Sequence, residues 1–242
     1  MQRFNLLPDV IKNLIIINGL FFLATMALGN AFGLPLIHYL GLHLPGSPGF
    51  APYQLVTHLF MHADFGHFFF NMFALWMFGY TLENIWGAKR FLNYYLITGF
   101  GAALLHFGVQ YYEYQIAIEG FSPEMINLIK TEGFDVVVNS QNYTNPQLAA
   151  ANALLNQPTV GASGAVFGIL LAFGMLFPNQ PIFFIFLPIP IKAKYFVAGY
   201  GVLELINGFT STGNVAHFAH LGGMLFGFLV LRYWKSKYGT YH

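Results

Sequence analysis

The sequence predicts an all-α membrane protein, a bundle of six transmembrane helices with both termini in the cytoplasm. Of the 242 residues, 56% are hydrophobic and only 8% are charged. Soluble domains carry about 25% charged residues, so this chain lacks the material for a water-exposed surface. Six segments are apolar over roughly the 20 residues that a membrane-spanning helix needs. They cover residues 10–31, 67–86, 91–109, 162–178, 193–210 and 216–234.

Local signals set the ends of these segments. No cleavage-site pattern follows the first apolar run, so we interpret it as a retained span. The fourth span is short, and Pro178-Asn179 ends it. The stretch from 181 to 192 is apolar but contains three prolines. We place it at the membrane interface, because irregular backbone in contact with lipid would leave polar groups unpaired.

Basic residues set the direction of the spans. The chain has ten Lys and Arg residues, and all but Lys130 fall on one side of the predicted bundle. Because positive charge is enriched on the cytoplasmic side, both termini are expected there. The external segment at about 111–158, between spans three and four, holds most of the acids: Glu113, Glu119, Glu124, Glu132 and Asp135.

The composition excludes several kinds of chemistry. The chain has no cysteine, so thiol catalysis, cysteine-ligated metals and disulfides are excluded. The net charge is only +1 and no basic face is present, so we expect no nucleic-acid partner.

Polar residues gather near the outer ends of three predicted spans. Ionisable groups are costly in a membrane, and those that are kept there mark candidate functional sites. The residues are His62, His67 and Asn71 of the second span, Ser163 of the fourth, and His217 and His220 of the sixth.

Small residues predict which of these groups meet. The fourth span carries a small residue at every fourth position over residues 164–172, and the sixth has glycine at positions 223 and 227. Such seams allow two helices to approach closely in lipid. Packing along the seams would make Ser163 and His220 neighbours, and serine beside histidine is the minimal nucleophile–base pair. The alternative use of Ser163 is as an N-cap, whose hydroxyl accepts a backbone N–H bond.

Four motifs together carry a resemblance to a known family. They are His62-x4-His67-x3-Asn71, Glu83-Asn-Ile-Trp-Gly87, Gly161-Ala-Ser163-Gly164 and Ala219-His220-Leu-Gly-Gly223. With these motifs in this order and on these spans, the chain resembles the rhomboid intramembrane serine proteases over nearly its whole length. The resemblance implies a six-span rhomboid bundle and a single peptidase domain over residues 1–242, with its core at about 50–234.

The resemblance also implies an activity. It implies that Ser163 and His220 form a catalytic dyad, facing a water-filled cavity open to the outside. The dyad would cut membrane-anchored proteins in or near their transmembrane segment, close to the outer leaflet. No cofactor and no metal are implied.

The resemblance further implies where substrate and oxyanion bind. The side chains of His67 and Asn71 and the backbone at Gly161 and Ala162 would stabilise the oxyanion. The N-terminus of the fourth span adds partial positive charge at the same place. The remaining supporting residues are His62, Gly164 and Gly223.

Other polar residues are assigned structural roles. Tyr53-Gln54 stands where the family often carries Trp-Arg, so a contact made by that arginine is not expected here. No carboxylate matches the third member of a triad, and Asp64 is disfavoured as one. We interpret Glu204, alone in the fifth span, as neutral or hydrogen-bonded for structural reasons. His106 and His217 are interpreted as packing residues.

The external segment carries signals for two short helices. Ser122-Pro123-Glu124 supplies a cap, a first-turn proline and an early acid, and Asn145-Pro146 repeats the first two signals. Apolar residues follow both signals and give each helix an apolar face. The segment therefore either packs as a cap on the outer ends of the spans or covers the site and selects substrates.

Two further functions stay open. A catalytically inactive rhomboid-like protein would bind membrane proteins, but it would be expected to lose Ser163 or His220. A histidine-rich metal-dependent membrane protein would use the histidines at 62, 67, 217 and 220, but HExxH and the usual carboxylate ligand are missing.

The predicted partners are transmembrane protein substrates and the lipid bilayer, and a homo-oligomer is left open. The predicted location is multi-pass in a bacterial inner membrane, with the active site facing outside.

Overall fold

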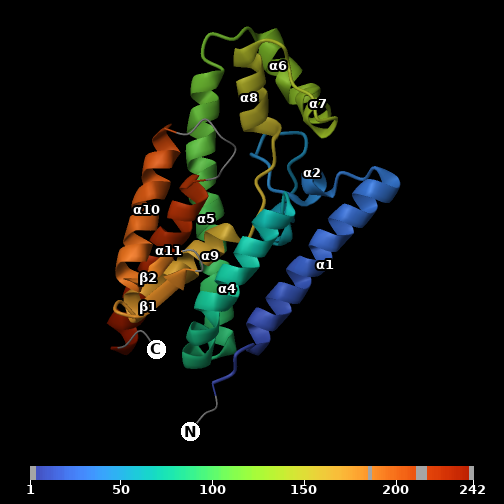
Figure 1. Ribbon diagram of the computed structural model, residues 1–242. Coiled ribbons are helices and arrows are strands. Elements are labelled where there is room, and N and C mark those ends of the chain that lie inside the picture. Colours follow the sequence, from blue (N-terminus) through green and yellow to red (C-terminus); the bar gives the residue numbers. More distant parts are fainter. Residues whose placement is uncertain (1–3, 185–186, 211–216, 240–242) are drawn as a thin grey trace. The chain divides into compact units, whose positions relative to one another are not determined.

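The computed structural model describes residues 4–184, 187–210 and 217–239. Within these ranges the chain forms eleven α-helices, one 3-10 helix and one two-stranded sheet (Figure 1). It divides into two compact units. The first comprises Met1–Ile16, Phe69–Leu105 and Ala162–His242, and the second comprises Ile17–Phe68 and His106–Gly161.

Each of the six predicted spans coincides with a helix. Among the described residues, α1 and α5 are long and apolar enough to cross a membrane, and α9 is apolar but shorter. That all six helices cross the membrane stays a prediction. The helices are α1 (Asp9–Phe32), α4 (Phe65–Trp86), α5 (Ala88–Ala117), α9 (Ser163–Leu176), α10 (Ala193–Thr210) and α11 (His217–Tyr238).

In the first unit, α9 packs against α11 along the two glycine seams, with α10 beside both (Figure 1). A Cβ atom added to Gly223 would collide with the carbonyl of Gly164. A Cβ atom on Gly227 would lie 3.3 Å from the Cα of Gly168. Backbones can approach this closely only where no side chain intervenes, so the predicted seam packing is confirmed.

Glu83 ties α4 to the start of α1 within the first unit. Its carboxylate is buried, and it accepts hydrogen bonds from the backbone N–H groups of Val10 (2.9 Å) and Ile11 (3.0 Å). These N–H groups belong to the first turn of α1, where no intrahelical acceptor exists and negative charge is favoured. This contact explains the acid in the Glu83–Gly87 motif.

The stretch between α9 and α10 corrects a sequence prediction. Instead of irregular backbone, it forms an antiparallel hairpin of β1 (Pro181–Phe184) and β2 (Leu187–Lys192), with Ile182 paired to Ile191. Proline cannot donate to a strand ladder, but each strand of a two-stranded ribbon has a free edge that tolerates it.

The second unit confirms both helices predicted in the external segment. They are α6 (Pro123–Thr131) and α8 (Pro146–Asn156), and α7 (Gly133–Val138), which the sequence analysis does not predict, lies between them. The Ser122 hydroxyl accepts from the N–H of Met125, and Asn145 caps α8 in the same way. The apolar faces meet in a core of Leu44, Tyr114, Ile129, Leu148, Ala151 and Leu155.

The segment between α1 and α4 also belongs to the second unit. It contains α2 (Leu36–Leu40), α3 (Gln54–Thr57) and the 3-10 helix η1 (His58–Phe60). A two-residue bridge pairs Leu42 with Thr159, which joins this segment to the chain just before α9.

Candidate active site

Ser163 is the first residue of α9, and its hydroxyl is not a helix cap. Gly161 has φ +122°, a conformation that favours glycine, and its N–H donates to the carbonyl of His58 at 2.9 Å. The N-cap position of α9 belongs to Ala162, which is fully buried and has no side-chain cap bond. The capping role considered for Ser163 is therefore wrong, and its hydroxyl is available for another partner.

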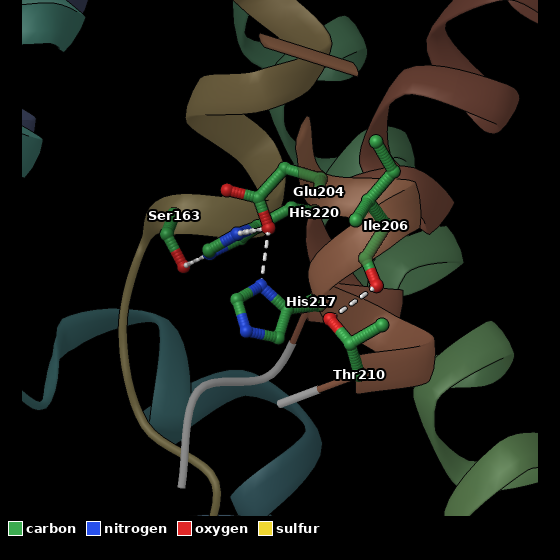
Figure 2. A network of polar contacts seen from close by, with 6 residues as sticks. All are labelled: Ser163, Glu204, Ile206, Thr210, His217 and His220. Atoms are coloured by element: carbon green, nitrogen blue, oxygen red, sulfur yellow. Dashed lines mark hydrogen bonds and ion pairs between the residues drawn. The ribbon is translucent and has the colours of Figure 1, made fainter. Parts of the chain in front are cut away.

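That partner is His220, on α11. Ser163 Oγ lies 2.9 Å from Nε2 of the His220 ring (Figure 2). The ring of Phe167, one turn after Ser163 on α9, stacks on the imidazole with 4.2 Å between centroids and 6° between planes. The helix seams bring the two polar groups together, and the stacked phenyl ring fixes the plane of the imidazole.

Glu204 completes the cluster from α10. Its side chain is buried, and Oε2 lies 2.9 Å from Nδ1 of His220 and 2.7 Å from Nδ1 of His217 (Figure 2). A carboxylate oxygen has two lone pairs and accepts from both rings, so each ring carries its hydrogen on Nδ1. In this tautomer Nε2 of His220 is unprotonated and faces the hydroxyl of Ser163 as an acceptor.

The sequence analysis expected Glu204 to be neutral or hydrogen-bonded, but it did not predict His220 and His217 as its partners. The signal was present, because a lone acid in an apolar span is expensive and demands a partner. Glu204 also lies six residues before the end of α10, and His220 lies three residues after the start of α11. Two consecutive membrane spans run antiparallel, so this spacing places both residues within about two turns of the same side of the predicted bundle.

The other predicted site residues lie on and before α4. Asp64 caps this helix, since its Oδ1 accepts from the backbone N–H of His67 at 2.8 Å. Asn71 is buried one turn later. Asp64 and His67 belong to the second unit, whereas Asn71 and Ser163 belong to the first. The oxyanion roles of His67 and Asn71 therefore stay predictions.

His62 is buried and packs edge-on against its neighbours. Its ring centroid lies 5.1 Å from that of His67 and 5.5 Å from that of Phe68. Neither ring nitrogen has a hydrogen-bond partner among the described residues, so the contacts of this supporting residue there are packing contacts. Burial lowers the pKa of His62 to about 4, which keeps the ring neutral at physiological pH.

The comparison with known proteins decides the family. Residues 50–236, more than half of the chain, match the Rhomboid domain. The chain belongs to the rhomboid family. It is therefore an integral membrane protein, as its composition predicts, and all four sequence motifs lie inside the matched range.

This rhomboid resembles both mitochondrial and bacterial relatives. It is 27% identical over 176 residues to Rhomboid protein 1, mitochondrial, of Saccharomyces cerevisiae, covering 73% of this chain and 40% of the yeast protein. It is 28% identical to Rhomboid protease AarA of Providencia stuartii, covering 71% and 52%. It is 26% identical to the human presenilin-associated rhomboid-like protein, mitochondrial, covering 74% and 38%. The match thus spans about half or less of each of these relatives.

Two further histidines of the rhomboid chain serve its structure. His106 Nε2 lies 2.8 Å from Thr159 Oγ1, consistent with the structural role expected for it. His58 is buried on η1, with Nδ1 2.7 Å from the carbonyl oxygen of Gln54. Burial lowers the pKa of His58 to about 4, because the charged ring would lose its hydration.

The structure also bears on the alternative hypothesis that the histidines bind a metal. The four histidines considered for it are divided, with His62 and His67 in the second unit and His217 and His220 in the first. Within the described part of the chain, one group of possible ligands stands out instead: Glu204, His217 and His220 offer ligand atoms within 4.8 Å of one another. Two histidines and a glutamate are also a ligand set of catalytic zinc.

Proposed function

We propose that this rhomboid is an intramembrane serine endopeptidase that cuts membrane-anchored proteins in or near their transmembrane segment. The observation that carries the proposal is the 2.9 Å contact between Ser163 Oγ and His220 Nε2. A serine hydroxyl is a weak nucleophile until an adjacent base accepts its proton, and this contact supplies that base. An inactive relative would have no need of it.

The chemistry follows from the tautomer. As Ser163 Oγ bonds to the carbonyl carbon of the substrate, its proton passes to Nε2 of His220. When the tetrahedral intermediate collapses, the C–N bond breaks and the same proton passes to the departing amine nitrogen. Water then enters, and its oxygen bonds to the acyl carbon as one of its protons passes to Nε2 of His220. When the ester bond to Ser163 Oγ breaks, that proton passes from His220 to Oγ, so the acid product leaves and the serine is regenerated.

The oxyanion of the intermediate needs donors aimed at the place where charge develops. We assign this role to the side chains of His67 and Asn71 and to the backbone N–H groups of Ala162 and Ser163. The N–H of Gly161 already donates to the carbonyl of His58, so Gly161 contributes its turn conformation instead of a donor. The first N–H groups of a helix lack intrahelical acceptors, and the helix dipole favours negative charge there.

The proposal includes the topology. Six spans with both termini cytoplasmic would place Ser163 near the outer face, so cleavage would occur close to the outer leaflet. Transmembrane proteins are the proposed substrates. A bacterial inner membrane stays a prediction, because the relatives include both a bacterial protein and proteins named as mitochondrial.

The test uses purified full-length protein in lipid vesicles with a fluorescent transmembrane reporter and a fluorophosphonate probe. Ser163→Ala and His220→Ala should each abolish reporter cleavage and probe labelling. In a soluble serine protease, each such loss costs on the order of a millionfold. The double variant should be no worse, because the pair acts as a unit.

The matched control is Ser122→Ala, which removes a serine hydroxyl that caps α6. It should retain activity. Wild-type protein that neither labels nor cuts any reporter, or a Ser163→Ala variant that still cuts, would contradict the proposal.

A further inference from the structure

Burying the carboxylate of Glu204 costs free energy, and its hydrogen-bond partners indicate its role. It is buried in α10, where an ionised group without partners would be strongly destabilised. Its partners are two imidazole rings on the neighbouring helix, at 2.7 and 2.9 Å. Charge-assisted bonds of this length stabilise both sides. One of these rings belongs to the proposed base.

The geometry points to Glu204 as the positioning residue of a Ser163–His220–Glu204 triad, in place of a dyad. This inference rests on the proposed serine protease function. Glu204 touches neither the serine nor the scissile bond. It acts through His220, by fixing which ring nitrogen carries the hydrogen and by stabilising the imidazolium that forms when the serine proton arrives.

The proton count shows why a carboxylate matters at this position. A neutral imidazole has one N–H, and Oε2 of Glu204 draws it to Nδ1, so Nε2 is free to accept from Ser163. After transfer the ring carries both hydrogens and a positive charge. The hydrogen on Nδ1 stays on nitrogen and no proton moves to Glu204, which remains an anion beside the cation.

His217 keeps the carboxylate in place. It donates to the same oxygen, Oε2, and so prevents that oxygen from rotating away from His220 (Figure 2). Among the described residues, the groups that contact the His220 ring include the Ser163 hydroxyl, the Glu204 carboxylate, the stacked Phe167 ring and, on its own helix, His217. His217→Ala should accordingly lower kcat by less than loss of the Glu204 carboxylate does.

The central experiment compares Glu204→Gln with wild type in the vesicle assay. Glutamine keeps the size of the side chain, but it removes the charge and can donate an N–H to Nδ1, which places the hydrogen on the wrong nitrogen. We expect kcat to fall by about 10²- to 10⁴-fold with KM within about threefold, since loss of the orienting acid costs about 10⁴ in soluble enzymes. The rate of fluorophosphonate labelling at Ser163 should fall in parallel.

Two more variants sharpen the result. Glu204→Asp keeps a carboxylate on a side chain shorter by one methylene, so its kcat should lie between those of Glu204→Gln and the wild type. If Glu204→Gln does not fold, the same measurements are made on Glu204→Asp, whose kcat should fall below that of the wild type. Thr210→Val is the matched control. It removes a hydroxyl from the same helix. In the wild type this hydroxyl donates to the carbonyl of Ile206 at 2.9 Å (Figure 2). Its rates should stay within about twofold of wild type.

Four outcomes would overturn the inference. If Glu204→Gln lowers the melting temperature or raises KM but labels at the wild-type rate per folded molecule, Glu204 is structural. If a chelator inactivates the wild type and added zinc restores it, the three residues bind a metal. If Glu204→Gln cuts at the wild-type rate while Ser163→Ala is inert, the triad fails and the protease function stands. A wild type that is inert toward both reporter and probe instead overturns the proposed function and the triad with it.

Discussion

At the scale of single residues, Gln54 shows how one side chain organises a loop. It is fully buried and uses both ends of its amide. Its oxygen accepts from the backbone N–H groups of His43 (3.3 Å) and Ala51 (3.1 Å). Its nitrogen donates to the carbonyls of Tyr39 (3.1 Å) and Gly49 (2.7 Å). An amide has two donor hydrogens and two acceptor lone pairs, so Gln54 is fully satisfied.

Replacing Gln54 with methionine should therefore destabilise the protein. The apolar side chain is of similar length, but it leaves four backbone groups of the loop without their partner. An unsatisfied buried group costs about 1–3 kcal/mol. We expect a total loss of roughly 2–4 kcal/mol and a melting temperature lower by about 5–10 °C, measured by thermal unfolding in detergent.

The neighbouring residue supplies the control. Tyr53 is 52% exposed, so Tyr53→Met should change the melting temperature by no more than about 1–2 °C. Equal effects of the two substitutions would show that Gln54 does not organise the loop.

At the scale of elements, the packing of α9 on α11 decides whether the site exists. Ser163 lies beside the first glycine of one seam, and His220 lies one turn before Gly223 of the other. Two rigid helices carry the two groups, so a small separation of the helices would break the 2.9 Å contact. The site is therefore sensitive to any side chain placed in the seam.

Gly223→Ala tests this dependence. The added methyl group would collide with the carbonyl of Gly164, which is backbone and cannot rotate away. We expect a loss of about 1–3 kcal/mol from overpacking, together with a sharp fall in labelling of Ser163.

Gly199→Ala, on α10, is the matched control. Among the described residues, a Cβ atom there meets no heavy atom within 4 Å. Because glycine weakens a helix interior relative to alanine, this variant should be unchanged or more stable by roughly 0.5–1 kcal/mol. If both variants retain wild-type labelling and stability, close seam packing is not required.

At the scale of the whole molecule, the distribution of basic residues makes a prediction about orientation. Nearly all Lys and Arg residues fall on the side predicted to be cytoplasmic. One of them, Arg90, lies over the ring of Trp234 with its guanidinium carbon 4.2 Å from the ring centroid. Such pairs of aromatic and cationic side chains are typical of a membrane–water interface.

Single cysteines test the orientation without background, because the chain has none of its own. Cysteine in place of Lys130 or Gln141 should react with an impermeant maleimide from outside intact cells. Cysteine in place of Lys89 or Lys194 should react only after the cells are opened. All four positions are exposed, so lack of labelling reports the side of the membrane and not burial. The reverse pattern would contradict both the topology and an externally facing site.

Features of this protein that depend on local signals could be predicted from its amino-acid sequence. Runs of apolar residues located the six helices α1, α4, α5, α9, α10 and α11, and the caps at Ser122 and Asn145 located two short ones. Glycine spacing predicted that Ser163 and His220 are neighbours, because small residues at every fourth position define one face of a helix.

Features that depend on partners distant in the chain could be seen only in the folded protein. Glu204 on α10 contacts His220 on the neighbouring α11, and Gln54 bonds to four backbone groups that no spacing rule connects. Residues 181–184 pair with residues 187–192 despite their prolines. The cost of burying a carboxylate or an amide is visible in a sequence, because it depends on the residue type. The group that offsets this cost is set by the relative position of helices, which only packing determines.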